Sequence, residues 1–358
     1  MQLVWFRNDL RLQDNPAFHA ACSQGEPVTA LVCLTPQQWE AHHESPARIA
    51  FWQDRLNWLQ TELEALNIPL LRLSLQRFSD CPAAILELAR SLQASHLHFN
   101  YEYPLNEQTR DRAVCEALQS VSIKAWGYHG DLILPPGSVL TGSGGPFKVF
   151  TPFSRAWRRH LLQVDHAPLP APTAVPVSDH ASTTANCAAN SDAYDRLLWP
   201  VDQAALLEQL QDFVESREHS YAAKRDFPAI KGTSSLSPAL TIGALSARQC
   251  LAALQQARGD DSWLESTWLN ELIWREFYRH LLVAFPGQSR LEPFRPEVET
   301  RISWLENEKA FEAWKAGETG YPIVDAAMKQ LLATGWMHNR LRMIVASFLT
   351  KLLRIDWR

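Results

Sequence analysis

The chain has 358 residues, enough for a sizeable core and about two domains. It is 46% hydrophobic and 20% charged, with no apolar run long enough to span a bilayer and no signal-peptide pattern at its start. The six cysteines lack C-x-x-C spacing, so no metal site is expected and a reduced, cytoplasmic compartment fits best. The net charge of −5 argues against a nucleic-acid partner, although residues 271–358, with 13 basic and 11 acidic residues, can form a local phosphate-binding face.

The first third of the chain alternates short apolar runs with longer helical patterns. Strands are predicted at 3–6, 28–34, 70–73, 96–99 and 123–126, and helices at 16–24, 47–66, 81–93 and 105–119. This alternation predicts an α/β domain with a doubly wound parallel sheet, whose ligand sites lie at the carboxyl ends of the strands. No G-x-G-x-x-G follows the first strand, so the usual dinucleotide fingerprint is missing.

The middle of the chain breaks this alternation. Residues 166–193 are rich in Pro, Ala, Ser and Thr and have no hydrophobic period, which predicts a linker that wraps over the surface. From residue 202 onward the patterns are helical. We therefore expect an α/β domain over 1–130, an interdomain linker over 131–200 and an all-α domain over 201–358.

A long helical pattern at 268–280, WLNELIWREFYRH, carries charged residues between aromatic ones. At 100° per residue, Trp268, Glu271, Arg275 and Tyr278 share one face. An i,i+4 pair on a solvated face is the simplest interpretation. However, the other positions of this helix are apolar, and buried charges need a partner or a ligand.

Two further segments can likewise be interpreted either as purely structural or as ligand-binding. In TGWMHNRLRM (334–343), Trp336, Asn339 and Arg342 share a helix face. Gly335 before them suits a turn at a helix start, where backbone N–H groups favour an anion. In GTSSLSPAL (232–240), a run of hydroxyl residues precedes a helix-starting proline. Such a run can cap the helix or bind a pyrophosphate.

Six sequence motifs, taken together and in order, are specific enough to indicate a protein family. They run in the order RNDLRLQDN (7–15), FKVFTPF (147–153), RDFPAIKGTSSLS (225–237), WLNELIWREFYRH (268–280), TGYPIVDAAMKQL (319–331) and TGWMHNRLRMIVASFL (334–349). This set resembles the photolyase/cryptochrome family, and most closely the folate-type bacterial class I photolyases for cyclobutane pyrimidine dimers. The resemblance extends from Leu3 to Arg358.

The resemblance implies a flavoprotein. Members of the family bind FAD inside the helical domain, which makes 201–358 the expected FAD-binding domain and 1–130 the expected antenna domain. Carried over by position, the flavin contacts are Tyr221, Thr233, Ser234, Ser235, Leu236, Ser237, Trp268, Glu271, Arg275, Asn339 and Arg342.

The resemblance also implies a substrate, UV-damaged DNA with the pyrimidine dimer flipped out of the duplex. Excited reduced flavin gives an electron to the dimer, the cyclobutane ring opens and the electron returns. Trp274 is expected to stack on the dimer, Glu271 to hydrogen-bond its carbonyls and Met343 to pack beside it. The phosphate contacts are expected at Lys148, Arg225, Arg340 and Arg342.

Two tryptophans and an antenna site complete the implied machinery. Trp304 and Trp357 match members of the tryptophan chain that photoreduces oxidised flavin in the family. The antenna is expected to be 5,10-methenyltetrahydrofolate, held by Asn106 and Glu107. From the residues alone, this last pair also suits a helix N-terminus.

The alternatives are a cryptochrome-type photoreceptor and an α/β nucleotide-binding module whose helical part only packs. The residues Glu271, Trp274 and Met343 favour repair over these alternatives. The protein is expected to be a monomer. The sequence stops at Arg358, where members of the family continue into a further helical segment. A further alternative is therefore a truncated, non-catalytic fragment of a photolyase, with the fold of residues 1–330 kept and repair activity poor or absent.

Overall fold

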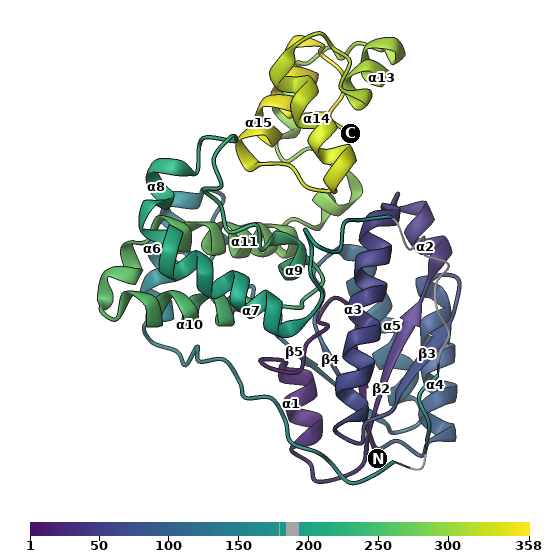
Figure 1. Ribbon diagram of the computed structural model, residues 1–358. Helices are drawn as coiled ribbons and strands as arrows, with labels where there is room; N and C mark the ends of the chain where they lie inside the picture. Colours follow the sequence, from purple (N-terminus) through teal and green to yellow (C-terminus); the bar gives the residue numbers. More distant parts are fainter. Residues whose placement is uncertain (179, 184–192) are drawn as a thin grey trace. The chain divides into compact units, whose positions relative to one another are not determined.

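The computed structural model describes residues 1–178, 180–183 and 193–358 and consists of two compact units (Figure 1). The larger unit contains Met1–Ser216 and Ser234–Pro286, and the smaller contains Arg217–Thr233 and Gly287–Arg358. The domain boundaries near residues 130 and 200 stay a prediction. No helix among the described residues is long and apolar enough to cross a membrane.

The larger unit contains a five-stranded parallel sheet with the order β3-β2-β1-β4-β5. The strands are β1 (Gln2–Trp5), β2 (Val28–Leu34), β3 (Leu70–Ser74), β4 (His96–Asn100) and β5 (Lys124–Tyr128). The chain leaves the central strand β1 first toward β3 and later returns to β4 on its other side, which is the doubly wound arrangement. The predicted α/β fold class is confirmed.

Helices alternate with these strands along the chain (Figure 1). They are α1 (Pro16–Cys22), α2 (Pro36–Ala41), α3 (Pro46–Glu64), α4 (Cys81–Ser91) and α5 (Leu105–Gln119). Since side chains alternate across a strand, Leu3 and Trp5 of β1 enter the core formed with α4 and α5. Phe6 packs on Phe18 of α1, with ring centroids 5.7 Å apart.

The remaining regular structure of the larger unit is mainly helical. It contains α6 (Phe150–Leu161), α7 (Gln203–Asp212), α9 (Ser237–Thr241), α10 (Ala247–Arg258) and α11 (Thr267–Ala284). Helix α6 lies inside the range expected to be a linker. Its apolar residues Phe153, Trp157 and Leu161 recur every four positions and are buried, which gives one face for packing on α11.

The segment predicted to wrap over the surface has no regular structure where it is described. Its backbone is hydrogen-bonded to the α/β part, from Val175 N to Leu66 O at 3.2 Å and from Thr183 N to Leu70 O at 3.0 Å. Residues 179 and 184–192 of this prediction, with Cys187, lie outside the described residues.

The smaller unit is also helical, which confirms the all-α prediction for this part of the chain. It contains α8 (Tyr221–Lys224), α12 (Pro296–Glu299), α13 (Glu308–Ala316), α14 (Pro322–Thr334) and α15 (Asn339–Ser347). Val324 and Met328 of α14 pack with Leu341 and Val345 of α15 in its core.

Gly335 lies in the turn between α14 and α15, and α15 begins only at Asn339. Gly335 has φ +70° and ends α14 in the left-handed conformation that glycine adopts without strain. Helix α15 is instead capped by His338, whose side chain accepts from the backbone N–H of Arg340 at 3.1 Å.

Candidate functional site

The motif at 7–15 forms a buried polar junction after strand β1. The guanidinium of Arg11 donates to the carbonyls of Asp14 (2.7 and 3.0 Å), Gly130 (2.6 Å) and Gly243 (3.1 Å). The side chain is 2% exposed, and burial lowers the pKa of Arg11. Because these carbonyls come from three separate segments, Arg11 ties the end of β1 to the residues after β5 and before α10.

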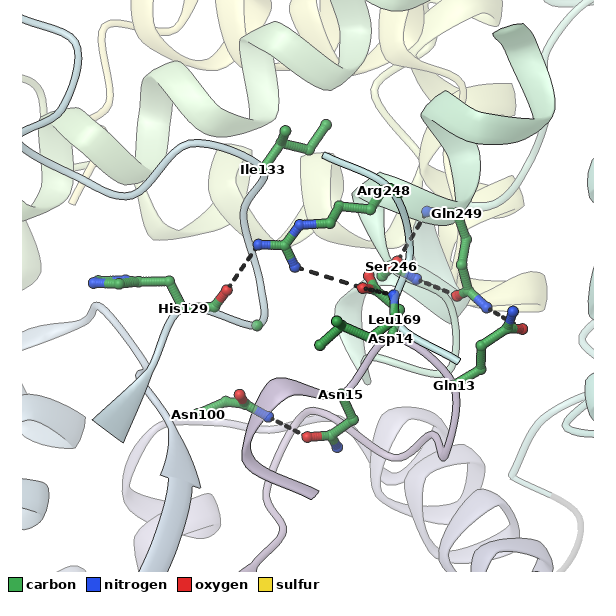
Figure 2. A network of polar contacts seen from close by, with 12 residues as sticks. Gln13, Asp14, Asn15, Asn100, His129, Ile133, Leu169, Ser246, Arg248 and Gln249 are labelled. Carbon is green, nitrogen blue, oxygen red and sulfur yellow. Dashed lines mark hydrogen bonds and ion pairs between the residues drawn. The ribbon is translucent and has the colours of Figure 1, made fainter. Parts of the chain in front are cut away.

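Helix α10 reaches the same junction (Figure 2). Arg248 lies 3.7 Å from the Asp14 carboxylate and donates to the carbonyl of His129 at 3.3 Å. Gln249 closes a capping box with Ser246 and donates to Gln13 at 3.1 Å. The α/β part and helix α10 are therefore joined by polar contacts within the larger unit.

Two neighbouring cavities open at the carboxyl ends of β1 and β4. One has a volume of about 210 Å³ and the other about 100 Å³, and both are lined by Arg7, Asn8 and Glu107. This is the edge at which a doubly wound sheet binds ligands. Within the 210 Å³ cavity, Tyr101 and Asp131 form part of the wall.

The predicted antenna residues Asn106 and Glu107 lie in the first turn of α5, and only Glu107 lines these cavities. Asn106 donates to His42 at 3.2 Å, and Glu107 faces both cavities. Burial, followed by the nearby Glu102 carboxylate, raises the pKa of Glu107. Neither residue caps the helix, since the N-cap position belongs to Pro104 and has no side-chain hydrogen bond. The simple capping interpretation is therefore wrong.

Helix α11 carries four of the predicted site residues. The hydroxyl of Ser266 caps it, accepting from the backbone N–H groups of Trp268 and Leu269 at 3.1 and 3.2 Å. Trp268 is buried against Phe213, with ring centroids 5.0 Å apart. Glu271, one turn later, is half-buried. Trp268 and Tyr278, which are predicted to share one face of the helix, differ in exposure. Trp268 is buried, whereas Tyr278 is 60% exposed.

The indole of Trp274 belongs to an aromatic stack. It lies parallel to Phe150 of α6, with ring centroids 3.6 Å apart and an angle of 4°, and Tyr278 is 5.5 Å from it. Trp274 is half-buried, so part of the ring system stays accessible. An apolar, half-exposed aromatic platform is suited to stacking on a nucleobase.

Arg275 is paired within the protein. It donates to the carbonyl of Asp131 at 2.6 Å and to the Asp131 carboxylate, which Arg279 also contacts at 3.1 Å. Although burial opposes the charged form, the Asp131 carboxylate raises the pKa of Arg275. Burial also opposes the charge on Asp131, but Arg275 and Arg279 keep the pKa of Asp131 below its ordinary value. The positive charge predicted for Arg275 is therefore offset by a neighbouring carboxylate.

Glu276, the next residue of α11, is completely buried. Its carboxylate accepts hydrogen bonds from the backbone N–H of Ile133, the backbone N–H of Leu134 at 3.2 Å and the Trp157 indole at 2.5 Å. Burial raises the pKa of Glu276 to about 7, in spite of these donors and of Arg275.

This raised pKa predicts a pH dependence of stability. The folded chain binds a proton at Glu276 up to about pH 7, whereas the unfolded chain releases it near pH 4.5. The free energy of unfolding should therefore fall as the pH rises between these values, by about 3 kcal/mol from this group. Urea denaturation from pH 5 to 8 of the wild type and Glu276→Gln measures it. The difference between the two proteins should change over this window, and a constant difference contradicts the prediction.

The hydroxyl run at 233–237 leads into helix α9. Pro238 occupies the first turn of this helix, as predicted, and Ser235 lies in the left-handed region with φ +56°. Among the residues that the structure describes, none is hydrogen-bonded to the hydroxyls of Ser234, Ser235 or Ser237. Leu236 is buried and fixes the run against the unit. Three hydroxyls are thus available to a ligand.

The remaining flavin predictions fall in the smaller unit. Tyr221 is buried on α8, and Thr233 accepts from Arg217 through its carbonyl at 3.0 Å. Asn339 and Arg342 are exposed on α15, where Arg342 donates to the carbonyl of Met337 at 3.1 Å. The predicted flavin residues are therefore divided between the two units.

The predicted DNA contacts also divide between the units. In the larger one, Lys148 is exposed and lies 5.4 Å from the Phe285 ring. In the smaller one, Arg340 pairs with Asp226, and Met343 is 55% exposed. Arg225, also in the smaller unit, is half-buried and lies 3.9 Å from Asp226.

The two predicted electron-transfer tryptophans come together in the smaller unit. The Trp304 indole donates to Glu299 at 2.9 Å, and the Trp357 indole donates to the same carboxylate. These indole hydrogen bonds lower the pKa of Glu299. Trp357 is 41% exposed.

Sequence reasoning missed several polar residues. Arg11 and Glu276 are buried charged residues of the larger unit, and Asp131 pairs with Arg275 and Arg279, yet only the motifs around Arg11 and Glu276 were noted. Their charged residues at otherwise apolar positions were the available signal. No group of His, Cys, Asp and Glu that could hold a metal ion occurs among the described residues.

Comparison with known families finds two matches. Residues 2–174 match the family described as DNA photolyase, and residues 268–358 match the FAD binding domain of DNA photolyase. The deoxyribodipyrimidine photo-lyase of Salmonella typhimurium is 48% identical over 99% of this chain and 76% of its own length. The corresponding protein of Escherichia coli is 44% identical, with the same coverage.

Solved structures that resemble this chain include photolyases and a cryptochrome. A bacterial class III photolyase from Agrobacterium tumefaciens has a TM-score of 0.85 at 32% identity, covering 99% of this chain and 73% of its own. A cryptochrome of Synechocystis has a TM-score of 0.86 at 28% identity, covering all of this chain and 76% of its own. The chain thus spans about three-quarters of the length of these relatives. Together with the ordered motifs and the fold, these matches show that the chain belongs to the DNA photolyase family.

Proposed function

We propose that this protein is a deoxyribodipyrimidine photo-lyase that uses FAD and light to split cyclobutane pyrimidine dimers in DNA. The main support for the proposal is the similarity of this chain to the photo-lyase of Salmonella typhimurium, which is 48% identical over 99% of the chain. The residues of α11 support it, because a half-exposed Trp274 and a half-buried Glu271 present an aromatic surface and a polar group on one helix.

The hydroxyl run fits a flavin dinucleotide. Ser234, Ser235 and Ser237 offer hydroxyl groups that have no hydrogen-bond partner among the described residues, and a pyrophosphate is an acceptor that hydroxyls satisfy. When bound, reduced FAD supplies the light-absorbing electron donor. The protein's part is to hold it, and the proposed contacts are Tyr221, Thr233, Ser234, Ser235, Leu236, Ser237, Trp268, Glu271, Arg275, Asn339 and Arg342.

The substrate contacts follow from the same proposal. Trp274 stacks on the extruded dimer through the part of its indole that Phe150 leaves accessible. Glu271 hydrogen-bonds the polar edge of the bases, and Met343 packs beside them. Lys148, Arg225, Arg340 and Arg342 bind phosphates, with Arg340 shared between DNA and Asp226.

We assign the antenna site to the rim of the 210 Å³ cavity. Asn106 and Glu107 are the proposed contacts for 5,10-methenyltetrahydrofolate, and the half-buried Glu107 faces the cavity. Trp304 and Trp357 are the proposed electron donors to oxidised flavin. The scattered cysteines support a reduced cytoplasmic compartment, and we expect a monomer.

The function is tested in two steps. The absorption spectrum of the purified chain, incubated with FAD and desalted, should show flavin bands. The loaded protein should then remove thymine dimers from an irradiated oligonucleotide in light and not in darkness. A chain that retains no flavin contradicts the proposal.

A photoreceptor is the second candidate, because the cryptochrome of Synechocystis has a TM-score of 0.86 with this chain. Flavin retention without light-dependent loss of dimers would favour it. Lesion-specific binding in darkness would favour repair.

Replacing Trp274 by alanine should weaken the binding of damaged DNA. Stacking on an aromatic side chain contributes about 1–3 kcal/mol per base, so the affinity for a dimer-containing oligonucleotide should fall about 5- to 150-fold. The affinity for undamaged DNA should stay the same. Fluorescence anisotropy in darkness measures both. Trp126→Ala is the control, since Trp126 is 49% exposed on β5, and an equal loss in both variants contradicts the assignment.

A further inference from the structure

Glu276 has an environment that the proposed chemistry does not use. Its carboxylate, 0% exposed, accepts from two successive backbone N–H groups, Ile133 and Leu134, and from the indole of Trp157 on α6. These donors lie 143, 142 and 119 positions away in the sequence. A buried carboxylate with three donors fixes the elements that carry those donors.

The neighbours of Glu276 hold the same short segment. Arg275 and Arg279 both contact Asp131, and His280 lies 3.0 Å from the carbonyl of Leu134. Residues 131–134 are thus held along more than one turn of α11. The preceding residues are fixed too, because Arg11 binds the carbonyl of Gly130 and Arg248 that of His129. Figure 2 shows Arg248 directed at the carbonyl of His129.

Glu276 lies on the opposite side of α11 from the proposed substrate residues. At 100° per residue, Glu271 and Trp274 are about 140° and 160° around the helix from it. The helix is rigid, so its rotation and axial position at Glu276 determine where Glu271 and Trp274 lie. A shift of the order of an ångström at such residues is enough to weaken recognition.

We propose that Glu276 is a positioning residue, whose three hydrogen bonds set the rotation of α11 and thereby place Trp274 and Glu271 against the DNA lesion. The inference rests on the proposed function for the identity of the lesion. Glutamine cannot replace the ionised carboxylate that is present above about pH 7, because it offers one acceptor oxygen and its NH₂ group would face an N–H donor.

The experiment uses Glu276→Gln in the full chain with two readouts. The first is the set of indole N–H signals in the ¹⁵N-tryptophan NMR spectrum, with the Trp274 signal assigned from Trp274→Phe. The second is the ratio of affinities for an oligonucleotide with one thymine dimer and for its undamaged counterpart. Glu276→Gln should move the Trp274 signal and lower the affinity ratio by the order of tenfold.

Leu269→Ala is the matched control. Leu269 is fully buried on the same face of α11, two turns before Glu276, so its loss destabilises the helix without removing the hydrogen bonds. The control should leave the affinity ratio and the Trp274 signal close to those of the wild type. Equal effects of the two variants would show a loss of stability alone and overturn the proposal.

Trp157→Phe keeps the test decisive if Glu276→Gln does not fold. It removes one of the three donors and should move the Trp274 signal in the same direction by a smaller amount. An unmoved Trp274 signal overturns the inference. A wild-type chain without lesion preference would contradict the proposed function instead, and the Trp274 signal alone would then decide the role of Glu276.

Discussion

Gly243→Ala should lower the free energy of unfolding of the larger unit by about 3–5 kcal/mol, through backbone strain and overpacking together. Gly243 has φ +66°, where a Cβ is strained. The added Cβ would also lie 2.2 Å from the carbonyl oxygen of Asn8 and 2.5 Å from the Cα of Asp9. Both are backbone atoms, so relief requires the segment after β1 to move away from the turn before α10.

The control for this prediction is Gly259→Ala. Gly259 has nearly the same φ, +68°, at the end of α10, but nothing lies within 4 Å of the added Cβ. It should cost only the conformational strain, about 1 kcal/mol. Urea denaturation followed by tryptophan fluorescence compares the two variants. If both variants lose the same free energy of unfolding, the close approach of the added Cβ to Asn8 does not contribute to the loss.

Arg11→Met should be destabilising by a similar amount, about 3–5 kcal/mol. The substitution keeps most of the side-chain volume but removes every donor to the carbonyls of Asp14, Gly130 and Gly243. These carbonyls would stay buried without their partner, which costs more than the hydrogen bonds contribute. Arg11→Lys should recover only part of the loss, since an ammonium cannot reproduce the planar fork.

Denaturant unfolding at neutral pH measures this effect, with Arg155→Met as the control. Arg155 is exposed on α6, and its replacement should change the free energy of unfolding by less than about 0.5 kcal/mol. If Arg11→Met is as stable as Arg155→Met, the junction is held by other contacts.

Gly243→Ala acts on the segment after β1 rather than on α11, so it also separates folding from recognition. A folded Gly243→Ala variant should keep its preference for a dimer-containing oligonucleotide, because Trp274, Glu271 and the hydrogen bonds of Glu276 are unchanged. The Glu276→Gln variant should show the reverse, a changed preference. This contrast is the most direct evidence that the chain can provide for separate functions of the junction and the helix.

Local patterns were sufficient for the elements and for much of the proposed site. The apolar runs at 3–6 and 28–34 are strands β1 and β2, shifted by at most one residue, because period and burial are properties of neighbouring residues. The hydroxyl run before Pro238 does lead into a helix. One local interpretation failed at a boundary, since Pro104 rather than Asn106 or Glu107 takes the cap position of α5.

Amino-acid order alone thus determined the doubly wound sheet, the helical character of the second half and the family, since each depends on patterns within a few residues or on ordered motifs. Only the tertiary structure decided the partners of the buried charges. Arg275 pairs with Asp131 and Glu276 with Ile133 across more than 140 positions, and nothing in a local window specifies such a pair. The same holds for Gly243, whose need for glycine comes from the backbone of Asn8. Long-range contacts of this kind arise when packing brings distant segments together, and the sequence carries them only as charged residues or glycines in otherwise apolar surroundings.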